Sequence, residues 1–226
     1  MSNFFAIPIT DEWGTTYQLT TAGYTALVVL MLALLLLACF IGNSVKQPKF
    51  SARQLAFSAM AIAAAFVTYE IKLFHLPFGG SITLFSMLFL VLIGYWYGLR
   101  AGLMTAIAYG FLQLVSDPYI ISIPQMLVDY IFAFGALGLS GLFSKSKNGL
   151  VKGYIVGVLG RYFFAFLSGM IFFGAYAADY GMSAPVYSLV YNGIYLSVEA
   201  VLTLIILYLP PVKKVMGQLK TMATQR

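Results

Sequence analysis

Apolar residues run in long blocks along this chain, and short polar segments separate the blocks. Seven blocks are long enough, or nearly so, to cross about 30 Å of hydrocarbon. They predict membrane-spanning helices near residues 22–42, 53–74, 81–98, 101–116, 122–143, 150–175 and 187–209. Ser51 predicts the start of the second helix, and Pro210-Pro211 predicts a stop after the seventh. A tight turn at Leu99-Arg100 predicts that the third and fourth helices form an antiparallel hairpin.

The longest polar linker of the N-terminal half, NSVKQPKF, lies between the first two predicted helices. It divides the chain into an N-terminal segment with one extra helix and its linker (1–50), a six-helix core (51–212) and a basic tail (213–226). The first block follows Asp11 and Glu12 rather than a basic segment, which favours a retained anchor over a cleaved signal peptide. The predicted fold class is an all-α integral membrane protein with a six-helix core plus one extra N-terminal transmembrane helix.

The composition excludes a soluble protein. Hydrophobic residues make up 61% of the chain and charged residues 9%, whereas a soluble domain carries about 25% charged residues. The single cysteine and the single histidine exclude a disulfide framework and a Cys/His metal site. The chain also lacks GxxxxGK[ST], HExxH and GxSxG motifs. We therefore predict that the chain is not an enzyme, and we expect no catalytic residue, metal or cofactor.

The distribution of charge predicts the orientation in the membrane. The net charge is +6, and eleven of the thirteen basic residues fall in loops that seven spans would place on one side. The positive-inside rule then gives a multi-pass protein of the cell membrane with an outside N-terminus and a cytoplasmic C-terminus. The basic residues are thus explained by topology, and we expect no nucleic-acid partner.

Four charged residues fall within or at the edge of the predicted helices: Glu70, Asp129, Arg161 and Glu199. A charge inside the bilayer is costly, so we expect such residues to be paired, protonated or functional. In the segment YSLVYNGIYLSVE, three tyrosines and Glu199 are spaced by four and share one helix face. Glu199 lies near mid-span, and we expect it to form a structural pair with Arg161.

Several aromatic and polar residues fall near the helix ends predicted to face outside. These residues are Tyr119, Asp129, Tyr130, Phe173, Tyr187 and Asn192. A pocket with aromatic walls, one carboxylate and one amide suits a small, flat, polar ring. The sequence therefore predicts an outward-facing binding pocket.

The second predicted helix carries small residues at a spacing of four. Ala59 and Ala63 form one such pair, and Ala61 and Ala65 form another. Small residues at this spacing let a partner helix approach closely in lipid. Six core helices without an ATP-binding motif suggest a subunit of a larger transporter.

Four stretches of the chain resemble the thiamine-specific S component of energy-coupling factor (ECF) transporters. They are FGGSITLFSMLFLVLIGYWYGLRAGL, YIISIPQMLVDYIFAFGALGLSGLF, GRYFFAFLSGMIFFGAYA and PVYSLVYNGIYLSVE. The resemblance covers about residues 51–212. It implies a six-helix membrane protein that binds a vitamin from outside. It also implies docking onto a transmembrane coupling subunit and two ATPase subunits.

The resemblance also implies residue roles. Ala59 and Ala63 match the family's docking motif, and the substrate-binding positions match Tyr119, Asp129, Tyr130, Gly169, Tyr187 and Asn192. Two family tryptophans fall on Phe78 and Phe173, and the family's histidine falls on Ala165. The family's glutamate is the shorter Asp129. Because tryptophan is the strongest cation–π partner for a thiazolium ring, these departures weaken that attraction.

These observations predict an S component that takes up a thiamine-like vitamin with its partner ATPases. An alternative is the same role for a pyridoxine-type vitamin or hydroxymethylpyrimidine. Two further alternatives are an autonomous secondary transporter, coupled through Glu70, Asp129 or Glu199, and a membrane assembly factor that uses residues 1–50.

Overall fold

The computed structural model describes residues 4–11, 14–23, 25, 26, 29, 50–76 and 80–225. Its elements are β1 (Ala6–Asp11), β2 (Gly14–Leu19), α2 (Ala52–Glu70), β3 (Lys72–His75), β4 (Ser81–Thr83), α3 (Ser86–Tyr97), α4 (Leu99–Ser116), α5 (Ile123–Met126), η2 (Leu127–Phe132), α6 (Ala133–Gly135), η3 (Ala136–Phe143), α7 (Gly149–Phe172), η4 (Gly174–Tyr180), α8 (Ala184–Tyr208) and α9 (Pro210–Thr224). The elements α5, η2, α6 and η3 follow one another without a break and act as one long helix, residues 123–143.

The six predicted core helices are present among the described residues. Five are long and apolar enough to cross a membrane, namely α2, α4, the helix of residues 123–143, α7 and α8. The sixth, α3, is a shorter apolar helix. Ser51 caps α2 as predicted, because its side chain accepts a hydrogen bond from the Gln54 N–H and the Gln54 side chain accepts one from the Ser51 N–H. The predicted extra helix near 22–42 lies largely outside the described residues.

Two boundaries of the predicted helices are wrong. The helix predicted to run to residue 74 ends at Glu70, and the helix predicted from residue 81 begins at Ser86. The residues between them form β3 and β4, which pair antiparallel. The sequence PFGG between the two strands interrupts a helical pattern. The hairpin β1–β2 near the N-terminus was not predicted either.

The turn between α3 and α4 lies one residue earlier than predicted. Gly98, rather than Leu99-Arg100, connects the two helices. Its φ of +88° is a backbone conformation that residues with a Cβ rarely adopt. Leu99 already begins α4. The antiparallel hairpin itself is as predicted.

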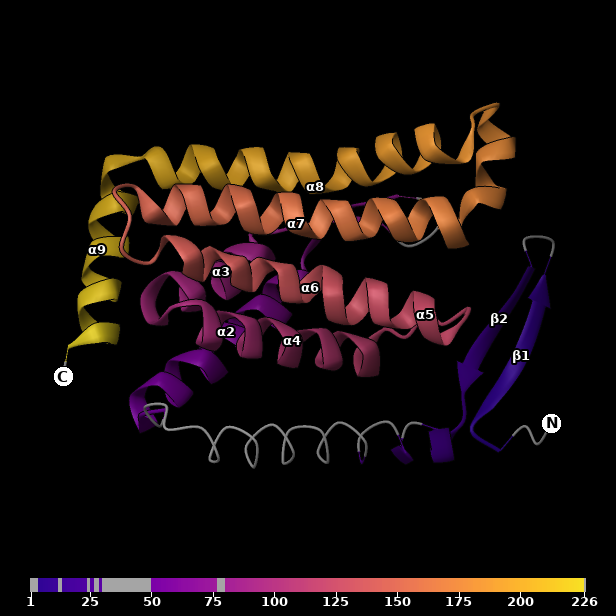
Figure 1. Ribbon diagram of the computed structural model, residues 1–226, viewed down its shortest axis with the longest axis horizontal. Coiled ribbons are helices and arrows are strands. Elements are labelled where there is room, and N and C mark those ends of the chain that lie inside the picture. Colours follow the sequence, from indigo (N-terminus) through magenta and orange to yellow (C-terminus); the bar gives the residue numbers. More distant parts are fainter. Residues whose placement is uncertain are drawn as a thin grey trace.

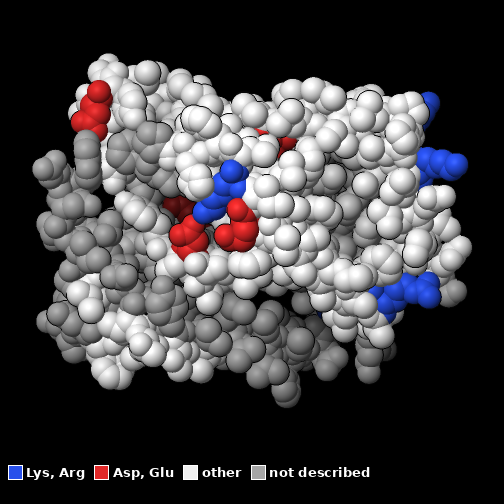
Figure 2. Space-filling model, turned by 180° about the vertical axis from the view of Figure 1, so that it is seen from behind, with Lys and Arg blue, Asp and Glu red and all other residues white. Residues whose placement is uncertain are grey.

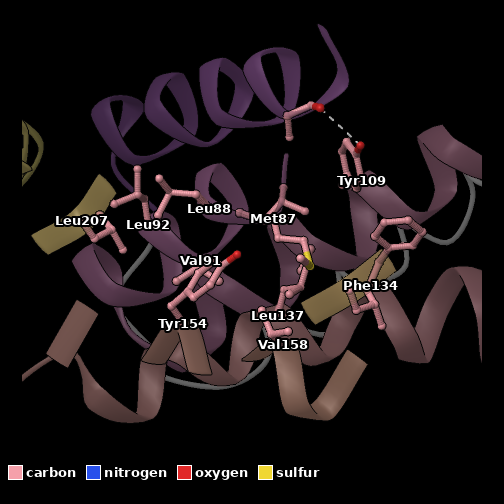
Figure 3. Close-up of a cluster of buried hydrophobic side chains, with 14 of the residues drawn as sticks. Met87, Leu88, Val91, Leu92, Tyr109, Phe134, Leu137, Tyr154, Val158 and Leu207 are labelled. Carbon is pink, nitrogen blue, oxygen red and sulfur yellow. Dashed lines mark hydrogen bonds between the residues drawn. The ribbon is translucent and has the colours of Figure 1, made fainter. Parts of the chain in front are cut away.

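The helices pack side by side with α3 in the centre. Figure 1 shows α7 next to α8, while α9 crosses one end of the bundle at a steep angle to α8. The η4 turn lies at the opposite end. Met87 and Val91 of α3 are fully buried against Leu137 and Tyr154 (Figure 3). Because α3 is surrounded by other helices, it can be short and apolar on nearly every side.

Charged residues separate between the two ends of the bundle. The described basic residues at the α9 end are Arg53, Arg100, Lys145, Lys147, Lys152, Lys213, Lys214 and Lys220. Figure 2 shows basic side chains gathered at one edge of the molecule, away from most acidic ones. At the other end Lys72 pairs with Asp117 at 3.9 Å. This separation is what the predicted orientation requires, and the orientation itself stays a prediction.

Candidate binding cavity

A cavity of about 430 Å³ lies between the helices, toward the end of the bundle opposite α9. Seven of the eight residues predicted to bind a ligand line it: Tyr119, Asp129, Tyr130, Gly169, Phe173, Tyr187 and Asn192. The eighth, Phe78, lies outside the described residues. The volume is within the roughly 300–1,000 Å³ of small-molecule sites. The fold thus brings these seven residues together, and their contact with a ligand stays a prediction.

The carboxylate of Asp129 is held by a buried amide. Asp129 lies in η2, a π-helical segment of the kind that often marks functional sites. Gln125 is 1% exposed, and its Nε2 donates to Asp129 Oδ2 at 2.7 Å and to the Tyr119 carbonyl at 3.0 Å. Its Oε1 accepts from the Ile121 N–H at 3.0 Å. Gln125 therefore ties the carboxylate to the loop that follows α4.

One part of the cavity lining is a set of aromatic rings from η2, from η4 and from the segments that follow α4 and α7. The Phe173 ring contacts the rings of Tyr119 and Tyr176, with centroid distances of 5.8 and 6.1 Å. The hydroxyls of Tyr119 and Tyr176 are 3.0 Å apart. Tyr130 Oη accepts from the Tyr119 N–H at 2.8 Å and donates to the Asp117 carbonyl at 2.9 Å. These hydrogen bonds hold flat apolar faces in fixed positions, which suits stacking against a ring.

A second part of the cavity lining is the tyrosine series of α8. Tyr187 and Tyr191 stack with centroids 5.5 Å apart, and Tyr195 meets Tyr191 edge-on at 5.9 Å. Tyr191 Oη accepts from the Gly80 N–H at 2.8 Å, and Tyr195 Oη donates to Asn192 Oδ1 at 2.9 Å. The spacing of four seen in the sequence therefore places all three tyrosines on the cavity.

Asn192 is fixed at the contact between α7 and α8. Its Nδ2 donates to the Ala165 carbonyl at 3.2 Å and to the Ser188 carbonyl at 2.9 Å. The two helices approach closely at Gly169, where an added Cβ would overlap Ser188 Oγ and lie 2.9 Å from Asn192 Nδ2. Gly169 therefore leaves the space in which the amide of Asn192 sits.

The expected pair of Arg161 and Glu199 is wrong. Glu199 is 4% exposed, and it accepts hydrogen bonds from the hydroxyls of Thr83 and Ser86 and from the first turn of α3. The guanidinium carbon Cζ of Arg161 instead lies 4.2 Å from the centre of the Phe134 ring, and Arg161 lines the cavity. The partners of Glu199 are therefore neutral donors and not a cation.

The cavity also contains residues that the sequence did not single out as binding residues. They include Tyr69, Gln113, Gln125, Arg161, Ser168, Tyr176, Tyr191 and Tyr195. Helical spacing could have indicated four of them, since Tyr191 and Tyr195 follow Tyr187 at intervals of four. Gln125 lies four residues before Asp129, and Arg161 lies eight before Gly169, so each shares a helix face with a predicted site residue.

The two pairs of small residues on α2 face different ways. Ala61 and Ala65 are 7% and 0% exposed and pack inside the bundle. Ala59 and Ala63 are exposed on its surface, as are Met60 and Val67. The predicted docking pair is thus accessible to a partner, while the other pair belongs to internal packing.

The fold and the cavity define a multi-span helical membrane protein with a solute-sized site of aromatic and polar groups at one end. The chain belongs to the family described as thiamine transporter protein (Thia_YuaJ), which matches residues 55–218.

Similar proteins agree with this assignment. The thiamine transporter ThiT of Bacillus subtilis (strain 168) is 33% identical over 178 residues, which are 72% of this chain and 92% of that protein. ThiT of Lacticaseibacillus paracasei is 32% identical over 124 residues, 49% of this chain and 59% of that protein. A solved structure of ThiT from Listeria monocytogenes superposes with a TM-score of 0.57 at 28% identity, covering 70% of this chain and 94% of that one. The family resemblance drawn from the sequence is therefore confirmed.

Proposed function

We propose that this chain is the substrate-binding membrane subunit of an ATP-driven ECF importer and that thiamine is its ligand. The observation that carries the proposal is the cavity of about 430 Å³, which gathers seven residues predicted to bind the vitamin. The names of the similar proteins support the choice of thiamine.

Thiamine has two flat rings and a positive charge, and the cavity offers groups for both properties. The rings of Tyr119, Phe173 and Tyr187 stack against the ligand and supply cation–π attraction to the thiazolium. Asp129 supplies the negative charge, and Asn192 orients the polar edge of the pyrimidine. Gly169 keeps room beside Asn192.

A second candidate ligand is a neutral ring, either a pyridoxine-type vitamin or hydroxymethylpyrimidine. It is favoured by Arg161, whose positive charge lines the cavity and repels a cation. Ala165 and Phe173, at the positions of a family histidine and tryptophan, also reduce the attraction for thiazolium. Both candidates use the same fold and the same transport role.

A calorimetric titration of the detergent-purified protein with thiamine, hydroxymethylpyrimidine and pyridoxine decides between them. We expect thiamine to bind at least about tenfold more tightly than either neutral ring, a difference of about 1.4 kcal/mol, because only thiamine offers Asp129 a cation. Tighter binding of pyridoxine or hydroxymethylpyrimidine would select the second candidate. Absence of binding to all three would contradict the proposed function and favour an assembly factor.

We further propose that the cavity opens to the outside and that the α9 end of the bundle faces the cytoplasm. We also propose that α2 docks on the transmembrane coupling subunit of the importer. The exposed pair Ala59 and Ala63 supports the docking surface, because small side chains let a partner helix approach closely in lipid. Two ATPase subunits then supply the energy that the chain itself has no motif to extract.

Ala63→Leu should therefore block uptake without affecting vitamin binding. The added side chain would hold the partner helix away, and we expect ATP-dependent uptake in proteoliposomes with the whole importer to fall by roughly tenfold or more. Val201→Leu is the matched control, since Val201 is 53% exposed on α8, away from α2. Uptake by the chain alone, driven by a proton gradient, would contradict this mechanism and favour a secondary transporter.

A further inference from the structure

Glu199 is a buried carboxylate that the proposed binding chemistry does not use. It is 4% exposed, in the middle of α8. A buried charge is costly unless hydrogen bonds compensate it. Its Oε2 accepts from Thr83 Oγ1 at 2.6 Å, and its Oε1 accepts from Ser86 Oγ at 3.2 Å and the Met87 N–H at 3.1 Å. Three donors from residues 83–87 thus satisfy this carboxylate.

These donors lie at and just before the start of α3, a helix whose own N-cap residue makes no side-chain hydrogen bond. The residue before the helix is Phe85, which has a φ of 60° and no side-chain oxygen to accept a bond. The first N–H groups of a helix have no partner within it, and negative charge is favourable beside them. Glu199 supplies that cap from a helix 112 residues away in sequence.

The same segment is tied to α8 at a second point. The Gly80 N–H donates to Tyr191 Oη at 2.8 Å, at the cavity. Tyr191 and Glu199 are eight residues apart, about 12 Å along a helix. Gly80 and Thr83 are three residues apart, about 10 Å in a strand. The two ties therefore match in spacing, and β4 lies along α8 between them.

The position of β4 sets the shape of the cavity. Gly80 and Ser81 line the cavity. There is little room beside Gly80, because an added Cβ would lie 2.7 Å from Tyr191 Oη and 3.1 Å from a ring carbon of Tyr195. Movement of β4 would therefore displace the two tyrosines or open a gap against them.

We infer that Glu199 is a positioning residue of the binding cavity. Its hydrogen bonds with Thr83 and Ser86 hold Gly80 and Ser81 against the tyrosines of α8. This inference rests on the proposed function only in assigning the cavity a ligand. Two α8 residues then have different roles. Tyr191 lines the cavity directly, whereas Glu199 holds β4, the strand next to the Gly80 that donates to Tyr191.

Cysteine labelling tests the position of β4 without any vitamin. In a chain that carries Cys39→Ala and Ser81→Cys, the rate of reaction with a water-soluble maleimide reports access to residue 81. Adding Glu199→Gln, which keeps the side-chain shape but loses one acceptor and the charge, should raise this rate roughly tenfold. Thr83→Val, which removes one donor from the other side, should raise it in the same direction.

Ser140→Ala is the matched control. Ser140 is fully buried and donates to the Val91 carbonyl at 3.0 Å, outside the cavity. It should lower thermal stability without changing the labelling rate. Equal labelling in the Ser140 and Glu199 variants at equal loss of stability, or an unchanged rate in both Glu199→Gln and Thr83→Val, would overturn the inference.

Titration with thiamine gives the second readout. Glu199→Gln should weaken binding roughly three- to tenfold, whereas Ser140→Ala should leave it unchanged. If the unaltered protein binds no thiamine, the proposed ligand is wrong, and the labelling rates still decide the role of Glu199.

Discussion

Replacing Asp129 by asparagine should weaken thiamine binding by roughly 100-fold, as measured by calorimetric titration of the purified protein. Asparagine keeps the shape of the side chain and can still accept the hydrogen bond from Gln125. It loses the charge that would face the thiazolium cation. Hydrogen bonds to charged groups contribute about 1.5–3 kcal/mol, and a factor of ten in affinity corresponds to about 1.4 kcal/mol.

Two comparisons isolate the charge of Asp129. Asp179→Asn removes an exposed carboxylate of η4 that does not line the cavity, and it should leave affinity unchanged. Hydroxymethylpyrimidine is neutral, so Asp129→Asn should weaken its binding far less than that of thiamine. An equal loss for both ligands would show that Asp129 acts as a hydrogen-bond acceptor and not through its charge.

The membrane helices could be predicted from the sequence, because long apolar blocks have few alternatives in a bilayer. The hairpin of β3 and β4 could not, because segments as short as KLFH and SIT fit a helix as well as a strand. What holds this hairpin in place includes the contacts of Gly80 with Tyr191 and of Thr83 with Glu199. Those partners lie more than a hundred residues away in the sequence.

The candidate site shows the same division between local and distant information. Position near the helix ends indicated Tyr119, Asp129 and Asn192, and the family resemblance added Gly169. All four line one cavity. What Arg161 and Glu199 contact was not visible in the sequence.

Arg161 and Glu199 illustrate why. Opposite charges at membrane depth suggest an ion pair, but the rotation of each helix decides what its charge meets. In the folded chain Arg161 turns to Phe134 and Glu199 turns to α3. Sequence spacing fixes which residues share a face of one helix, and it does not fix which face of another helix lies opposite.

Gly169→Ala should lower both thermal stability and thiamine affinity. The added Cβ would overlap Ser188 Oγ and press on the amide of Asn192, so α7 and α8 must separate or Asn192 must turn away. Overpacking of this kind costs about 1–3 kcal/mol. Displacement of Asn192 should weaken binding by about tenfold or more. Thermal unfolding in detergent and calorimetric titration measure the two effects.

Gly217→Ala on α9 should have the opposite effect on stability. Among the described residues, no atom outside the adjoining backbone of α9 lies within 4 Å of an added Cβ there, and alanine favours a helix over glycine by about 1 kcal/mol. A loss of stability in both variants would show that the substitution itself is harmful and that the close approach at Gly169 is not the cause.

The double variant Gly169→Ala with Ser188→Gly tests the overlap directly. Ser188→Gly alone removes two hydrogen bonds, the one that Ser188 Oγ donates to the Phe166 carbonyl and the one that it accepts from Asn192 Nδ2, and it should be destabilising. If the overlap with Ser188 causes the defect of Gly169→Ala, the double variant will be less impaired than the sum of the single ones, because the two side chains exchange the same space. Additive losses would mean that the new methyl group acts inside the cavity itself, where it takes room from the ligand. That result would make Gly169 a wall of the binding site and not a spacer between helices.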